Sequence, residues 1–126
     1  MSKILIVDED VASQMILSSE LKNEGYSVEA VESAEHALEL MRQTQFDLVI
    51  TEIRFGHECV FELIKQVKSV KLHRPNSDRV VAVIALTAFA NLTNAIECQK
   101  FGADDFVSKP YELTDLLVTI ERVLNS

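Results

Sequence analysis

Five polar positions follow short apolar segments, where folding could bring them together. The acid pair Asp8-Glu9 comes directly after the first apolar segment, and Glu52 follows another. Thr87 and Lys109 follow two more such segments. If the carboxylates share a pocket, two of them about 4 Å apart repel by roughly 4 kcal/mol at an effective dielectric constant near 20. The cluster therefore needs a proton, a cation or the Lys109 ammonium beside it.

A hard divalent cation is one chemistry that such a cluster would support. Mg²⁺ prefers oxygen ligands, and its candidate ligands here are Asp8, Glu9 and Glu52. The alternative is that these acids cap helices or lie as solvated charges in loops. Their positions at the ends of successive apolar segments favour a shared pocket over separate loops.

The apolar segments have the composition of strands in a parallel sheet. Three are nearly continuous apolar runs rich in β-branched residues, which is typical of strands covered on both faces. Two others are mixed in polarity or brief, and we expect them at the sheet edges, where one flank meets water. The predicted central strands are 3–7, 47–51 and 80–86, and the predicted edge strands are 26–31 and 105–109.

Helical patterns separate these strands. Apolar residues recur at i, i+3, i+4 and i+7 over residues 34–41, behind Ser33 as a capping residue. The same spacing runs to residue 124 in a last helix that begins just after Pro110. Less regular patterns predict helices over about 11–23, 59–71 and 90–100, and the polar segment 72–79 is expected to be a mobile loop.

Strict alternation of strand and helix, repeated five times, predicts right-handed crossovers and a parallel sheet with helices on both faces. The predicted fold is therefore α/β, a doubly wound five-stranded (βα)5 sheet with strand order 2-1-3-4-5. In such sheets ligands bind beyond the carboxyl ends of the strands, near the point where the strand order reverses. Strands one and three are neighbours in this order, so their acids would meet there.

Composition limits the classes of function. The length of 126 residues, with 48% apolar and 25% charged residues, predicts one compact domain over 1–126. A net charge of −8 argues against direct binding to nucleic acid or to an anionic membrane. The first apolar run is too short for a signal peptide or a spanning helix, so we expect a cytoplasmic protein. Cys59 and Cys98 lack CxxC spacing and are expected to be structural and partly buried.

In combination, these segments resemble the receiver domain of bacterial response regulators, the two-component signalling proteins that include the chemotaxis regulators. The resemblance spans the whole chain and rests on KILIVDED, DLVITEI, VIALTA, FGADDFVSKP and the closing helix. It implies a flavodoxin-like fold and a signalling module that is not an enzyme.

The resemblance also implies a role for each polar position. Glu9, with help from Asp8, would hold Mg²⁺. Thr87 and Lys109 would contact a phosphoryl group. Phe106 would be the aromatic residue that moves on activation, although the residue alone is equally compatible with a plain core phenylalanine.

The sequence departs from the family at the phosphate-accepting position, where Glu52 replaces the usual aspartate. Asp47 is at the opposite end of the same predicted strand, about 16 Å away at 3.3 Å per residue, and cannot take over. In-line attack on phosphorus tolerates errors of a fraction of an ångström, and glutamate moves the carboxylate oxygen by roughly 1.3 Å. We therefore expect ordinary aspartyl phosphorylation to be lost.

The expected function is a receiver domain that signals without that phosphorylation. The longer Glu52 side chain brings a negative charge toward Thr87 and Lys109 and could imitate the phosphorylated state in part, with about one charge against nearly two. The site would close either on Mg²⁺ or as a Glu52–Lys109 ion pair. The alternatives are a metal-dependent phosphoryl-handling enzyme and a receiver domain phosphorylated by a non-standard route.

The expected partners are proteins, with no nucleic acid and no membrane. They would be a sensor histidine kinase or a downstream output protein. The surface expected to contact them is formed by the helix over about 90–100, the strand 105–109 and the last helix. The same surface could carry a homodimer.

Overall fold

The computed structural model describes residues 2–70 and 80–125. A parallel five-stranded sheet forms its centre, in the order β2-β1-β3-β6-β7. Counted along the chain this is the predicted order 2-1-3-4-5, so the assignment of central and edge strands is confirmed. The strands are β1 (Lys3–Val7), β2 (Ser27–Val31), β3 (Leu48–Thr51), β6 (Ala82–Thr87) and β7 (Asp105–Ser108).

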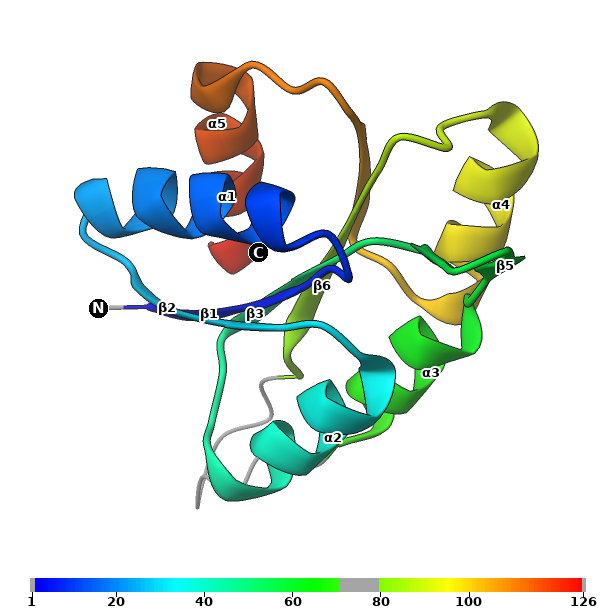
Figure 1. Ribbon diagram of the computed structural model, residues 1–126, viewed down its shortest axis with the longest axis horizontal. Helices are drawn as coiled ribbons and strands as arrows, with labels where there is room; N and C mark the ends of the chain where they lie inside the picture. The colour runs from blue at the N-terminus through cyan, green and yellow to red at the C-terminus, as the bar shows by residue number, and fades with distance from the viewer. Residues whose placement is uncertain (1, 71–79, 126) are drawn as a thin grey trace.

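Helices cover both faces of this sheet. Figure 1 shows α1 and α5 together on one side, with α2 and α3 on the other, and α4 packs against α3 and β7. This is the doubly wound α/β arrangement that the alternating pattern predicts. The helices are α1 (Val11–Asn23), α2 (Ala34–Gln43), α3 (Glu62–Ser69), α4 (Leu92–Phe101) and α5 (Leu113–Leu124).

Side-chain caps set the beginning of three helices. The predicted cap of α2 is confirmed, because the Ser33 hydroxyl accepts a hydrogen bond from the His36 N–H at 3.2 Å. Asp10 caps α1 through the Ser13 N–H at 3.2 Å, and Asn91 caps α4 at 2.8 Å. Each cap satisfies a backbone donor that the first helical turn leaves without an intrahelical partner.

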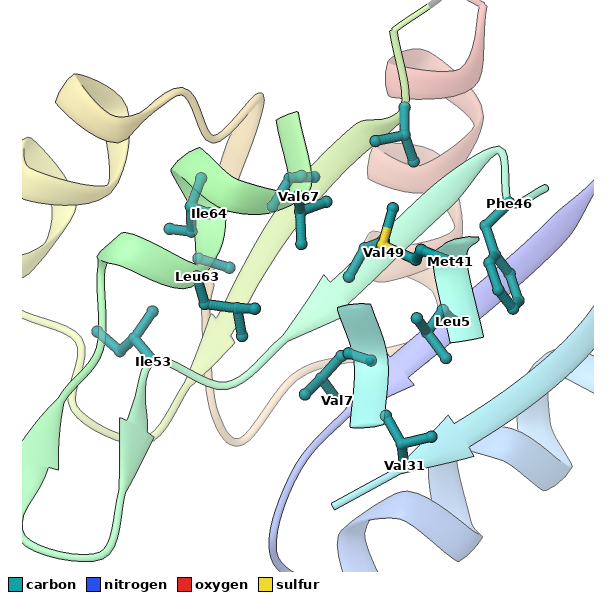
Figure 2. Close-up of a cluster of buried hydrophobic side chains, with 14 of the residues drawn as sticks. Leu5, Val7, Val31, Met41, Phe46, Val49, Ile53, Leu63, Ile64 and Val67 are labelled. Atoms are coloured by element: carbon teal, nitrogen blue, oxygen red, sulfur yellow. The ribbon is translucent and has the colours of Figure 1, made fainter. Parts of the chain in front are cut away.

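Successive side chains of the central strands point to opposite faces of the sheet, so the core consists of two clusters, one on each face. Leu5 and Val7 of β1 point toward α2 and α3, whereas Ile4 and Ile6 point toward α1 and α5. Figure 2 shows the first of these clusters, in which Leu63, Ile64 and Val67 of α3 pack over β1 and β3. The sheet is thus buried on both sides, which fixes the strand ends relative to one another.

One local feature was not predicted. Residues 54–59 form a short antiparallel hairpin of β4 (Arg54–Phe55) and β5 (Glu58–Cys59). Its turn uses Gly56 at φ 64°, a conformation that side-chain-bearing residues rarely adopt. Cys59, the first residue assigned to a helix over 59–71, belongs to the hairpin instead, so the prediction was wrong at that end and α3 begins at Glu62.

The cysteines differ from the expectation in one case. Cys98 is fully buried, whereas Cys59 is exposed on β5. The predicted mobile loop 72–79 lies outside the described residues. Over residues 2–70 and 80–125, no helix has the length and apolar character needed to cross a membrane.

Burial of α3 provides a stability test with a matched control. Leu63 is 0% exposed and Leu92 of α4 is 77% exposed. We expect Leu63→Ala to lower the free energy of unfolding by about 3 kcal/mol, because it removes apolar contacts and leaves a cavity. Leu92→Ala should change it by less than about 0.5 kcal/mol. Urea denaturation measures both values, and equal losses in the two variants would contradict this account of the core.

Candidate functional site

The carboxyl ends of β1, β3, β6 and β7 lie together along the same end of the parallel sheet. Backbone hydrogen bonds continue the strand pairing one residue beyond the strands themselves. The Glu52 N–H donates to the Val7 carbonyl at 2.9 Å, and the Lys109 N–H donates to the Thr87 carbonyl at 2.8 Å. The side chains of Glu52 and Lys109 therefore start from rigid backbone positions rather than from loops.

Lys109 lies between two of the predicted acids. Its Nζ is 2.7 Å from Asp8 Oδ2 and 3.4 Å from Glu52 Oε2. The side chains of Lys109, Asp8 and Glu52 are 21%, 10% and 7% exposed. Three of the residues selected from the sequence thus form one partly buried ionic cluster, with one cation between two carboxylates.

The ionic contacts dominate the protonation of Lys109. Burial alone lowers its pKa, because a low-dielectric environment disfavours the charged ammonium. The hydrogen bond to Asp8 and attraction from Asp8 and Glu52 act in the opposite direction and together outweigh burial. The pKa of Lys109 is therefore raised above its ordinary 10.5, and the side chain is a cation at neutral pH.

The remaining carboxylate oxygens of the cluster are also occupied. Glu52 Oε1 accepts hydrogen bonds from the N–H groups of Ile53 at 2.8 Å and Arg54 at 3.3 Å. Asp8 Oδ1 accepts from the Asp10 N–H at 2.9 Å. All four oxygens of the two acids have donors, so their burial is compensated within the protein.

Glu9 contacts a different segment of the chain. Its Oε1 accepts a hydrogen bond from the Gly56 N–H at 2.8 Å, so it joins the end of β1 to the turn of the β4–β5 hairpin. The sequence-based expectation was that Glu9 holds a metal ion together with Asp8. In the structure Asp8 pairs with Lys109, whereas Glu9 contacts Gly56.

These contacts decide how well the site fits Mg²⁺. The carboxylate oxygens of Asp8 and Glu52 are of the kind that Mg²⁺ binds, but both acids are paired with Lys109. Within residues 2–70 and 80–125, no group of three or more His, Cys, Asp or Glu side chains is arranged to hold a metal ion. In this arrangement the Lys109 ammonium is the cation beside the two acids.

The other two predicted residues lie nearby in the fold. Thr87 is fully buried at the end of β6, and its hydroxyl oxygen accepts a hydrogen bond from the Phe89 N–H at 3.0 Å. Phe106 on β7 is partly buried and packs against the core cluster on the α2–α3 side. The two residues are on neighbouring strands, with Ala85 of β6 opposite Phe106.

Two residues at this edge were missed by the sequence analysis. The guanidinium carbon of Arg54 lies 4.2 Å from the centre of the Phe89 ring, which joins the segments that follow β3 and β6. A cation over an aromatic face is attracted by the ring quadrupole. The only sequence signal was the position of each residue, two places beyond Glu52 and Thr87.

Comparison with known proteins agrees with this fold. The model of the response regulator receiver domain family matches residues 4–121. The chain belongs to this family. A receiver domain is a signalling module, and such domains typically bind Mg²⁺ at their phosphorylation site and interact with sensor kinases and output domains.

Individual relatives give the same result. The transcriptional regulatory protein ZraR of Escherichia coli is 31% identical over 121 residues, which cover 96% of this chain and 26% of ZraR. The heme response regulator HssR of Staphylococcus saprophyticus is 32% identical, over 98% of this chain and 52% of that protein. The chain therefore spans only about a quarter to a half of these relatives.

Among solved structures, the chemotaxis protein CheY4 of Vibrio cholerae superposes with a TM-score of 0.81. It is 26% identical, and the alignment covers 98% of both chains. The receiver domain described here thus has the five-stranded, flavodoxin-like fold of these neighbours.

Removal of the Lys109 charge tests the ionic cluster. We expect Lys109→Met to lower the free energy of unfolding by about 2–4 kcal/mol near neutral pH, because two buried carboxylates lose their cation. Lys100, exposed and 3.5 Å from Glu97, is the control, and Lys100→Met should cost less than about 0.5 kcal/mol.

The loss should also depend on pH in one direction. Because folding raises the pKa of Lys109 above 10.5, its stabilising contribution is complete below that value and disappears as the pH rises through the folded pKa. The stability difference between wild type and Lys109→Met should therefore be constant up to about pH 10 and shrink as the pH rises from there to about pH 12. Urea denaturation at several pH values measures it, and a constant difference would contradict the ion-pair account.

Proposed function

We propose that this receiver domain signals without ordinary aspartyl phosphorylation, because Glu52 and Asp8 share Lys109 as their internal cation. The position of Lys109 Nζ, 2.7 Å from Asp8 and 3.4 Å from Glu52, is the observation that carries the proposal. The domain then acts as a binding module whose conformational balance is set by its sequence rather than by a covalent group.

The contacts of Glu52 argue against its use as a nucleophile. One of its oxygens accepts two backbone hydrogen bonds and the other faces Lys109. To attack a phosphorus atom, an oxygen would have to leave these donors and align with the donor group. The additional methylene of glutamate relative to aspartate further displaces that oxygen, by roughly 1.3 Å.

The same contacts favour an ion pair over a bound Mg²⁺. A cation entering the cluster would have to displace the Lys109 ammonium or bind beside it. Like charges about 4 Å apart repel by roughly 4 kcal/mol at an effective dielectric constant near 20. Lys109 therefore neutralises the acids and competes with a second cation for them.

Glu52 imitates a phosphorylated receiver only in part. Its carboxylate gives Lys109 a negative partner, as a phosphoryl group would. It supplies about one charge where a phosphoryl group supplies nearly two, with fewer acceptor oxygens. The Glu52 carboxylate is paired with Lys109, so the imitation rests on this ion pair.

We propose that the surface of α4, β7 and α5 contacts a protein partner. Exposed apolar side chains lie on both helices of this surface, including Ile96 on α4 and Val118 on α5. A sensor kinase, an output protein or a second copy of the chain would each cover them. The net charge of −8 argues that the partner is not nucleic acid.

Loss of phosphate acceptance is tested with Mg²⁺ and a small acyl-phosphate donor, followed by intact mass measurement. We expect no stoichiometric phosphoryl adduct on wild type, and an adduct on Glu52→Asp, which returns the carboxylate to the usual length. The double variant Asp47→Asn/Glu52→Asp is the control and should keep the adduct, since Asp47 is at the other end of β3. A full adduct on wild-type protein would overturn the proposal.

Competition between Lys109 and Mg²⁺ for Asp8 and Glu52 is tested by titration calorimetry. We expect Lys109→Ala to bind Mg²⁺ at least about tenfold more tightly than wild type, because removal of one positive charge leaves two adjacent carboxylates. The exposed-lysine variant Lys100→Ala should match wild type. Equal affinities in wild type and Lys109→Ala would show that the ion pair does not compete with the metal.

A further inference from the structure

Phe89 is a large aromatic residue at the surface, in the segment between β6 and α4. It is 41% exposed, and the face of its ring lies under the guanidinium of Arg54, with the guanidinium carbon 4.2 Å from the ring centre. Arg54 belongs to β4, which follows β3. The contact therefore joins the segments beyond two neighbouring strands, next to the ionic cluster.

Both backbone groups of Phe89 are tied to defined positions. Its N–H donates to the Thr87 hydroxyl oxygen at 3.0 Å, at the end of β6. Its carbonyl accepts from the Asn94 side-chain amide at 2.6 Å, in the first turn of α4. The position of the Phe89 ring is thus connected directly to the beginning of α4.

Arg54, the other residue of the contact, is also fixed by hydrogen bonds. Its N–H donates to Glu52 Oε1 at 3.3 Å, and its Nε donates to the Gly56 carbonyl at 3.4 Å. The orientation of its guanidinium therefore depends on the β4–β5 turn and on Glu52. A continuous set of contacts leads from Glu52 through Arg54 and Phe89 to Asn94.

The helix at the end of this set, α4, has the fewest buried residues of the five described helices. Of residues 92–101, all of which the structure describes, only Cys98 is buried. By contrast, α3 buries Leu63, Ile64 and Val67 over a shorter length. With one buried residue, α4 depends more than α3 on contacts at its ends.

We propose that Arg54 and Phe89 form a clasp that positions α4 in this chain. The clasp, defined as the contact of the Arg54 guanidinium with the Phe89 ring, holds the segment before α4 against the hairpin after β3. It links the position of Glu52 to the helix through a positioning residue, Arg54, without any change of covalent structure. Its meaning for signalling rests on the proposed function, in which α4 belongs to the partner surface.

The buried thiol of Cys98 is a reporter of α4 displacement. Cys59 and Cys98 are the two cysteines of the chain, and Cys59 is exposed, so Cys59→Ser leaves a single thiol inside the core. Burial raises the pKa of the Cys98 thiol to about 11, which makes it unreactive while α4 is in place. Its rate of reaction with an aromatic disulfide reagent then follows the local opening of α4.

The experiment measures this rate in the Cys59→Ser background. We expect Arg54→Ala to raise it by roughly fivefold, which corresponds to the loss of one cation–aromatic contact at a partly exposed site. Phe89→Leu should raise it by a similar factor. The double variant should be no faster than the faster single variant, because both substitutions break the same contact. Arg54→Lys, which keeps the charge, should be intermediate.

Two controls separate the clasp from general effects. Arg42→Ala, at an exposed position on α2, makes the same change of charge and should leave the rate within a factor of about two. Urea denaturation gives the global stability of each variant. The proposal is overturned if Arg54→Ala does not accelerate labelling, if the two single effects multiply, or if the acceleration equals the loss of global stability. None of these measurements involves a phosphate donor, so they stand apart from the test of Glu52.

Discussion

The Lys109 ammonium between Asp8 and Glu52 is the interaction on which this site depends. Two carboxylates at the ends of neighbouring parallel strands cannot both be ionised and buried without a cation close to them. The strand order meets that requirement, because β7 lies beside β6 and brings Lys109 to the edge where β1 and β3 end. A lysine 101 residues away along the chain from Asp8 thus becomes its nearest counter-ion.

Much of this arrangement could be predicted from local patterns. The apolar runs before Asp8, Glu52 and Thr87 fix the strands, and their alternation with helices fixes the topology. Convergence of the polar residues then follows from parallel geometry. The direction of Glu9 could not be predicted in this way, because it depends on the turn at Gly56, where one residue with φ 64° creates a hairpin and exposes a backbone donor. The Arg54–Phe89 contact was missed for a related reason. Both residues lie beyond the strand ends, where no periodicity indicates which way a side chain turns.

The length of the Glu52 side chain explains why its two oxygens serve different partners. One reaches across to Lys109, while the other turns back to the N–H groups of Ile53 and Arg54. The backbone that follows β3 is therefore ordered by the side chain that stands where an aspartate would accept phosphate. In the proposed function, the glutamate that displaces the nucleophilic oxygen also supplies a constant anion and orders the segment that carries Arg54.

A charge that is always present cannot by itself change the conformational equilibrium of the domain. In a phosphorylated receiver the covalent group adds and removes interaction energy, whereas the Asp8–Lys109–Glu52 cluster is present at all times near neutral pH. Any change in the position of α4 must then come from a ligand that binds one conformation more tightly than another, and the shift is limited by that difference in affinity. Because Cys98 is the one buried residue of α4, few core contacts oppose a displacement of this helix by a partner. In the proposed function, partner binding is therefore the signal, and Glu52 sets the conformational equilibrium on which the partner acts.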